Sequence, residues 1–207
     1  MTKSSARTAR PRDAAKQETR EALLRAATDL FRSEGLDASL DAVCARAGFT
    51  RGAFYVHFRD RDELLSAAIE RILTTLIDTL FGPPGSEDEF PVLVQRFLAT
   101  VASGHYPISR DGSLRPYQLL DACARSDAVR AQYLRLISTG EERLTVAIRR
   151  AQARAEVRDD VEAILVAKLL MGMVLGMQTM LDLQVPLDLP ALARLAMQLL
   201  TPAAVTK

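Results

Sequence analysis

The 207-residue sequence contains no tryptophan, two cysteines and two histidines. Cys44 and Cys123 lie far apart in stretches with helical spacing, which excludes a disulfide framework or a Cys/His zinc cluster. We therefore expect a reducing compartment, the cytoplasm. The sequence also lacks a glycine-rich phosphate loop, an HExxH motif and a nucleophile elbow. With so little histidine as well, we predict that the protein is not an enzyme and needs no cofactor or metal.

Long uncharged apolar runs are also missing. The most apolar stretch is "ILVAKLLMGMVLGMQTML" at 164–181, which contains Lys168 and Gln178. These two polar residues favour a helix buried in protein over a membrane span. The charges near the N-terminus are not followed by the apolar segment of a signal peptide. We therefore predict no association with a membrane.

What the sequence does contain is a balance of 48% hydrophobic and 26% charged residues, with a net charge of +1. This composition is typical of a folded domain, or of a small domain joined to a larger one. Basic residues outnumber acidic ones near the N-terminus, where the first twenty residues include Lys3, Arg7, Arg10, Arg12, Lys16 and Arg20. We predict that residues 1–15 form a disordered basic arm. Electrostatic attachment to nucleic acid is the functional alternative for this arm.

Strand-like alternation is absent, and turn signals recur at helix-length intervals, so we predict an all-α fold. The first helices are expected at 16–33, 40–47, 51–58 and 60–80. After the break "GPPGSEDEF" we expect helices at 90–103, 114–124, 127–154, 159–183 and 189–200. Helix starts are predicted at Ser39, Thr50, Asp60 (with Glu63 as capping-box partner), Asp127, Asp159 and Asp188.

The short helix at 51–58 has two unlike faces. Phe54 and Phe58 share one face and are expected to pack inward against the preceding helices. The opposite face carries small or β-branched side chains, flanked by two polar aromatic residues: Gly52, Ala53 and Val56, with Tyr55 and His57. Such a helix, after a tight glycine-containing turn, predicts a helix-turn-helix whose second helix enters the DNA major groove.

The stretch "TREALLRAATDLFRSEGLDASLDAVCARAGFTRGAFYVHFRDRDELL", residues 19–65, closely resembles the DNA-binding region of the tetracycline-repressor (TetR) family. The spacing matches through four helices, which makes the resemblance specific. It implies a DNA-binding domain at 16–62 and a larger helical domain at 63–207 that dimerises and binds a small molecule. Three residues depart from the family pattern. Cys44 lies where a small alanine is usual, Arg59 where proline is frequent and Arg61 where lysine is frequent. We interpret Cys44 as a small core residue and not as a redox sensor.

The expected DNA contacts follow from residue chemistry and from the resemblance together. Arg51 is predicted to bind guanine in the major groove, with contact to phosphate alone as the alternative. Tyr55 and His57 are predicted to bind phosphates, against the alternatives of a rim aromatic and a core-edge histidine. Val56 suits a thymine methyl group, and the N-terminus of helix 40–47 suits a phosphate. The full predicted set is Arg20, Ser39, Thr50, Arg51, Gly52, Ala53, Tyr55, Val56, His57 and Arg61.

The larger domain is predicted to supply two further surfaces. The dimer interface is expected on the last two helices, at Leu165, Leu169, Gly172, Gly176, Leu192, Leu195 and Leu199, with intramolecular packing as the alternative. The pocket for a small apolar or amphipathic effector is expected at Leu73, Phe97, His105, Tyr106, Tyr117, Tyr133, Arg143, Met171, Met173, Met177 and Gln178, many of which can equally be ordinary core.

The resemblance therefore implies a ligand-responsive transcriptional regulator. We expect a repressor that binds palindromic operator DNA as a homodimer and is released by its effector. An activator, a regulator that needs no ligand, and an interaction module that has lost DNA binding are the alternatives. Release requires the ligand to bind more tightly to a conformer in which helix 60–80 has swung and the two recognition helices no longer match the DNA.

Overall fold

The computed structural model describes residues 11–83, 85–103 and 116–202, and all regular structure in these ranges is α-helical. The helices are α1 (Pro11–Glu34), α2 (Leu40–Ala47), α3 (Arg51–Tyr55), α4 (Arg61–Phe81), α5 (Phe90–Ala102), α6 (Pro116–Arg125), α7 (Asp127–Ala153), α8 (Ala163–Asp182) and α9 (Leu189–Leu200). The prediction of an all-α fold is thus confirmed for the described residues.

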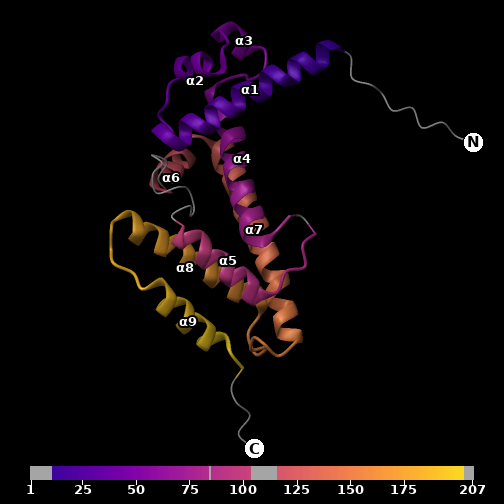
Figure 1. Cartoon of the computed structure of the whole chain (residues 1–207), viewed down its shortest axis with the longest axis vertical. Coiled ribbons are helices and arrows are strands. Elements are labelled where there is room, and N and C mark those ends of the chain that lie inside the picture. Colours follow the sequence, from indigo (N-terminus) through magenta and orange to yellow (C-terminus); the bar gives the residue numbers. More distant parts are fainter. Residues whose placement is uncertain (1–10, 84, 104–115, 203–207) are drawn as a thin grey trace, which may run out of the picture.

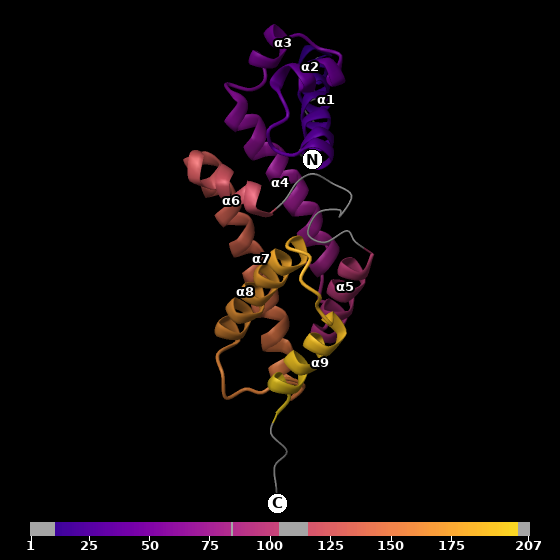
Figure 2. The ribbon, with the colours of Figure 1, turned by 90° about the vertical axis from the view of Figure 1, so that its left-hand side faces the viewer.

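The helices form an elongated molecule with α1, α2 and α3 gathered at one end (Figures 1 and 2). Helix α4 runs from this end into the body, where it packs along α7. Helices α5, α8 and α9 complete the far end, and α6 lies beside the upper part of α7 (Figure 2). Since α4 contacts both α1 and α7, it connects the two ends of the protein.

Two hydrophobic clusters hold this arrangement. The first joins α1–α4 to α6 and the start of α7, and its largest fully buried side chains include Phe31, Phe54 and Phe58. The second joins α5, α7, α8 and α9 around Ile148. Leu64 and Ala68 of α4 belong to the first cluster, so the packing unit of the N-terminal helices extends past the domain boundary expected at residue 62.

Local capping chemistry defines the first helices as the sequence predicted. The side chains of Ser39, Thr50 and Asp60 accept hydrogen bonds from the backbone N–H three residues later, at the starts of α2, α3 and α4. The Glu63 carboxylate reaches back as expected, but it accepts from the N–H of Arg59 and not from that of Asp60. Gly48 ends α2 with φ 76°, a left-handed conformation that favours glycine.

Two helix starts differ from the prediction. Helix α1 begins at Pro11 and not at Lys16, so residues 11–15 are helical where a disordered arm was expected; residues 1–10 lie outside the described residues. Proline is suited to a first helical turn because no partner is needed there for its missing N–H. Helix α7 begins at Asp127 as predicted, and Ser126 caps it. Helix α8 begins at Ala163 instead of 159.

The late start of α8 has a tertiary cause. The segment between α7 and α8 folds against the end of the molecule, where Val157 is buried and the Arg158 N–H donates to the Leu200 carbonyl over 2.7 Å. The Gln152 side chain donates to the carbonyls of Arg158 and Val161. These partners satisfy the backbone of a non-helical segment. The sequence had predicted a helix from Asp159 onward in this segment.

Candidate DNA-binding surface and ligand cavity

Helix α3 is held by its inner face. Phe54 and Phe58 are fully buried and stack with their ring centroids 5.6 Å apart. On the other side Gly52, Tyr55 and Val56 are exposed, while Ala53 and His57 are partly buried. The two-faced character expected from the residue spacing is therefore present, although α3 itself ends at Tyr55 and residues 56–57 continue as a turn.

The two polar aromatics differ in environment. Tyr55 is 57% exposed and meets the Phe54 ring edge-on at 5.1 Å. His57 has its Nδ1 atom buried without a hydrogen-bond partner. Burial, followed by the nearby charges of Lys16 and Arg20, lowers the pKa of His57 below its usual 6.5. The lowered pKa favours the neutral form of the His57 ring at pH 7.

Arg51, at the first position of α3, is paired with a carboxylate that the sequence did not single out. Its Nε donates to Asp41 Oδ1 over 2.5 Å and its Nη2 donates to Asp41 Oδ2 over 2.9 Å. Both side chains remain exposed. Asp41 lies in the first turn of α2, where an acidic residue is common for helix-dipole reasons, so its sequence position gave no sign of this contact.

The other two predicted arginines are engaged within the protein. The guanidinium of Arg61 donates to the carbonyls of Leu36 and Ala38 and lies 5.9 Å from the centre of the Phe31 ring. The guanidinium of Arg20 lies 4.8 Å from the centre of the Phe58 ring. Both side chains thus stabilise the packing of the N-terminal helices, a role that the prediction of phosphate contacts did not include.

A cavity of about 210 Å³ opens between the helices of the far end. Seven of the predicted residues line it: Leu73, Phe97, Tyr133, Met171, Met173, Met177 and Gln178. Further lining residues, which the sequence analysis did not name, come from α4, α5, α7 and α9 and include Phe81, Phe90, Gly140, Leu144 and Leu189. Their apolar character is shared with ordinary core residues, so no local signal distinguished them.

Two predicted pocket residues do not line this cavity, and two lie outside the described residues. Tyr117 is 65% exposed on α6 and does not line the cavity. Arg143 does not line it either, because its Nη1 donates hydrogen bonds to Asp78 and to the Gly82 carbonyl. His105 and Tyr106 fall among the residues that are not described.

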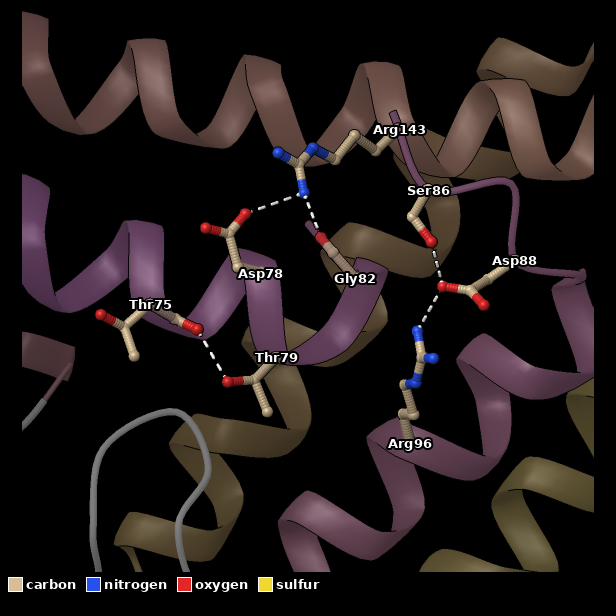
Figure 3. A network of polar contacts seen from close by, with 8 residues as sticks. All are labelled: Thr75, Asp78, Thr79, Gly82, Ser86, Asp88, Arg96 and Arg143. Atoms are coloured by element: carbon tan, nitrogen blue, oxygen red, sulfur yellow. Dashed lines mark hydrogen bonds and ion pairs between the residues drawn. The ribbon is translucent and has the colours of Figure 1, made fainter. Parts of the chain in front are cut away.

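Arg143 ties α7 to the end of α4 (Figure 3). Its Nη1 donates to Asp78 Oδ1 over 3.0 Å and to the Gly82 carbonyl over 2.8 Å. In the loop that follows, Asp88 accepts from Ser86 and from Arg96 of α5 (Figure 3). These hydrogen bonds, first that of Arg96, hold the pKa of Asp88 below its usual value. The C-terminal end of α4 is therefore fixed to α7, and the loop that follows it is fixed to α5.

The outer faces of α8 and α9 expose apolar residues in the single chain. Leu165, Leu169, Leu195 and Leu199 are all more than half exposed, and Gly172 and Gly176 of α8 are exposed too, with open space where a Cβ would stand. We call these six residues the α8–α9 face. The seventh predicted interface residue, Leu192, lines the cavity instead.

Helix α8 is much less buried than the sequence predicted. By length and composition it is apolar enough to cross a membrane, yet only 17% of its most apolar window is buried within the chain. An exposed apolar helix of this kind is unfavourable in water and marks a surface that another protein surface or a membrane covers.

A family model described as "Bacterial regulatory proteins, tetR family" matches residues 23–68. The uncharacterised HTH-type transcriptional regulator TtgW, from a strain of Pseudomonas putida, is 42% identical over 115 residues, which are 55% of this chain and 84% of TtgW. The HTH-type transcriptional regulator SrpR of Pseudomonas putida is 35% identical over 115 residues, which are 55% of this chain and 53% of SrpR. The matched region thus spans only about half the length of SrpR.

The fold is also found among solved structures. A structure of SmeT in complex with triclosan superposes with a TM-score of 0.62, covering 87% of this chain and 88% of SmeT at 23% identity. At this identity the likeness concerns the arrangement of the helices, which extends through the cavity-bearing end and not only through the matched N-terminal residues.

Proposed function

Because the chain belongs to the tetR family of bacterial regulatory proteins, we propose that it is a cytoplasmic repressor that binds palindromic operator DNA as a homodimer and leaves it when a small apolar or amphipathic effector binds. The observation that carries the proposal is the exposed side of α3, held outward by the buried Phe54 and Phe58. The cavity at the other end of α4 supports the effector, as does the triclosan bound by SmeT.

In this proposal α3 enters the major groove. Arg51 and Val56 read base edges, while Gly52 and Ala53 let the backbone approach. Tyr55 and His57 bind phosphates and set the position of the protein on the duplex. Ser39 and Thr50 contribute as well, because a hydroxyl that accepts a capping hydrogen bond still has its own proton to donate to phosphate.

The dimer forms through the α8–α9 face of each subunit. A two-fold axis pairs identical surfaces, and Gly172 and Gly176 allow the facing helices to approach closely. The symmetry places the two α3 helices so that they read half-sites about one helical turn apart or slightly more.

The effector acts through α4. Phe81, the last residue of α4, lines the cavity, and the neighbouring Gly82 carbonyl is held by Arg143. A ligand that displaces Phe81 strains this attachment, and α4 carries the movement to the first hydrophobic cluster and α1–α3. Repression is relieved only if the ligand binds the DNA-incompetent conformer more tightly.

The test is selection of DNA from a random double-stranded pool, followed by affinity measurements at several salt concentrations. Enrichment of a palindrome whose affinity falls steeply with salt supports the proposal. The substitution Arg51→Ala should relax base preference at one position of each half-site; an equal loss on all sequences reduces Arg51 to a phosphate contact. Failure to enrich any sequence at any salt concentration contradicts the DNA-binding role. DNA affinity unchanged by a saturating cavity ligand excludes that ligand as the effector.

A further inference from the structure

The wall of the cavity is almost entirely apolar. Among the described residues that line it, only Gln178 and Tyr133 carry a side-chain N–H or O–H group, and none is charged. Burial raises the pKa of Tyr133, so its phenol stays neutral. Arg143 is the one arginine that the sequence predicted as a pocket residue. Its guanidinium donates hydrogen bonds to Asp78 and to the Gly82 carbonyl. An ionised ligand would therefore lose its hydration without gaining a counter-charge.

Gln178 is one of the two polar residues in this apolar wall. It lies in the last turn but one of α8, is 7% exposed and lines the cavity. Its Oε1 atom is buried and has no hydrogen-bond partner. A buried acceptor without a partner destabilises a protein, whereas leucine or methionine at this position would fill the same space at no such cost. An unsatisfied amide in an apolar cavity is thus an open acceptor for a ligand group.

The size of the cavity limits what can reach this amide. Its volume of about 210 Å³ exceeds the roughly 150 Å³ of a cavity that holds benzene, and it is below the roughly 300–1,000 Å³ of pockets for drug-sized ligands. One ring with a short alkyl chain fits this range.

We propose that the cavity selects uncharged ligands of about one alkyl-substituted ring with a single hydrogen-bond donor, and that Gln178 is the residue that accepts from this donor. Phenols and benzylic alcohols have this chemistry. The inference rests on the proposed ligand-binding function and adds to it the ligand class and the residue that sets the specificity.

The test compares probes that differ only in the polar group. Binding of 4-propylphenol, 4-propyltoluene and 4-propylanisole to the full-length protein is measured by calorimetry, for the native chain and for Gln178→Leu. We expect the preference for the phenol over the isosteric toluene to fall about tenfold in Gln178→Leu, because one net hydrogen bond is lost. The anisole can accept but not donate, so it should behave like the toluene. The anion 4-propylbenzoate should bind roughly 100-fold more weakly than the phenol.

A matched control comes from a second buried glutamine. Gln132 of α7 is also 7% exposed, but its amide oxygen accepts from Arg135 and it does not line the cavity. Gln132→Leu should keep the full preference for the phenol. The inference is overturned if Gln178→Leu keeps it too, if the anisole binds like the phenol, if the benzoate binds as well as the neutral probes, or if no probe binds. All these measurements use protein without DNA, so failure of an effector to release DNA contradicts the proposed function alone.

The Arg51–Asp41 pair carries a second inference independently. The carboxylate occupies Nε and one N–H of Nη2, which leaves Nη1 and the other N–H of Nη2 free on the adjacent, terminal edge of the guanidinium. That free edge matches the O6 and N7 acceptors of guanine. A carboxylate beside α3 would otherwise only repel phosphates. We infer that Asp41 is a positioning residue that orients Arg51 toward one guanine.

Measuring base preference distinguishes an orienting role of Asp41 from a mere effect of its negative charge. With the selected operator, Asp41→Asn should lower guanine preference at the Arg51 position about tenfold, while affinity for non-specific DNA stays equal or rises as a negative charge is lost. In an Arg51→Ala background, Asp41→Asn should leave base preference unchanged. Asp37→Asn, which removes an exposed acid from the preceding turn, is the control for charge alone. Unchanged guanine preference in Asp41→Asn, with the palindrome still bound, overturns this inference and leaves the proposed function intact.

Discussion

The two ends of this protein are built in opposite ways. At the α1–α3 end, the candidate DNA contacts lie within 42 residues of each other in the sequence, from Arg20 to Arg61. At the other end, the cavity is lined by residues from Leu73 to Leu200 on six helices. At the first end the exposed side chains of Arg51 and Asp41 pair with each other, whereas the cavity wall holds one buried amide oxygen without a partner. Local chemistry therefore shapes one end, and long-range packing shapes the other.

This contrast implies that the ends can be altered separately. A change on the outer side of α3 should affect DNA binding without affecting the cavity, and a change at Gln178 should do the reverse. The α8–α9 face differs from both, because its loss should weaken DNA binding without touching the DNA surface.

The largest effect is expected from Leu169→Glu on the α8–α9 face. Leu169 is 63% exposed in the single chain, and a charge there would be buried without a partner in a dimer. We expect a monomer by light scattering and a loss of palindrome affinity of about 100-fold or more, because two half-sites no longer act together. Leu134→Glu is the matched control: Leu134 of α7 is 56% exposed but lies off this face. If Leu169→Glu stays dimeric, the interface is elsewhere.

A smaller effect is expected at the DNA end from Tyr55→Phe. The ring keeps its contact with Phe54, and only the exposed hydroxyl is removed. Loss of one hydrogen bond to a charged phosphate should lower affinity about tenfold on every sequence. Because the lost group is neutral, the slope of affinity against salt should not change. A changed slope, or weaker binding of 4-propylphenol, would show that Tyr55 does more than hold one phosphate.

At the cavity end, Gln178→Leu should make the protein more stable. Replacing a buried amide that lacks a partner by an apolar side chain of similar size should add about 1 kcal/mol to the free energy of unfolding. For a chain of this size that raises Tm by roughly 2–4 °C. Thermal unfolding without ligand measures the change, with Gln132→Leu as the control that should not gain stability. A lower Tm for Gln178→Leu would mean that the amide has a structural partner.

The smallest effect concerns pH and His57. Its pKa is lowered in the folded protein, so the unfolded chain binds more protons just below the usual pKa of 6.5. The stability that His57 contributes is present above pH 6.5 and is lost as the pH falls from there toward the lower folded pKa. Urea unfolding at pH 7.5 and pH 5.5 should therefore show a shallower decline for His57→Gln than for the native chain. A steeper decline in the variant would mean that His57 is charged in the folded state.

Several features were predictable because their causes are local. The caps at Ser39, Thr50 and Asp60, the glycine at the end of α2 and the inward face of Phe54 and Phe58 all follow from spacings of a few residues. The long helices α7 and α9 were located to within a residue or two for the same reason. The start of α8 was not, because residues 154–162 are held by partners on α7 and α9.

The site residues divide in the same way. Cys44 and Cys123 are buried, and burial raises the pKa of both thiols, which agrees with the interpretation of Cys44 as a core residue. In contrast, Arg61 and Arg143 are capable of binding an anion or a ligand by their chemistry alone. Their actual partners are the carbonyls of Leu36 and Gly82, which are 25 and 61 residues away in the sequence.

The order of residues from Thr19 to Leu65 was sufficient to identify a helix-turn-helix of the tetR family, since caps, turns and a two-faced helix are set by neighbours along the chain. It was not sufficient to show that Asp41 holds Arg51, that Leu192 lines the cavity while Leu169 is exposed, or that Gln178 is buried without a partner. A side chain's hydrogen-bonding capacity is intrinsic to the residue, but whether water, a distant backbone group or nothing satisfies it depends on which helices pack against it.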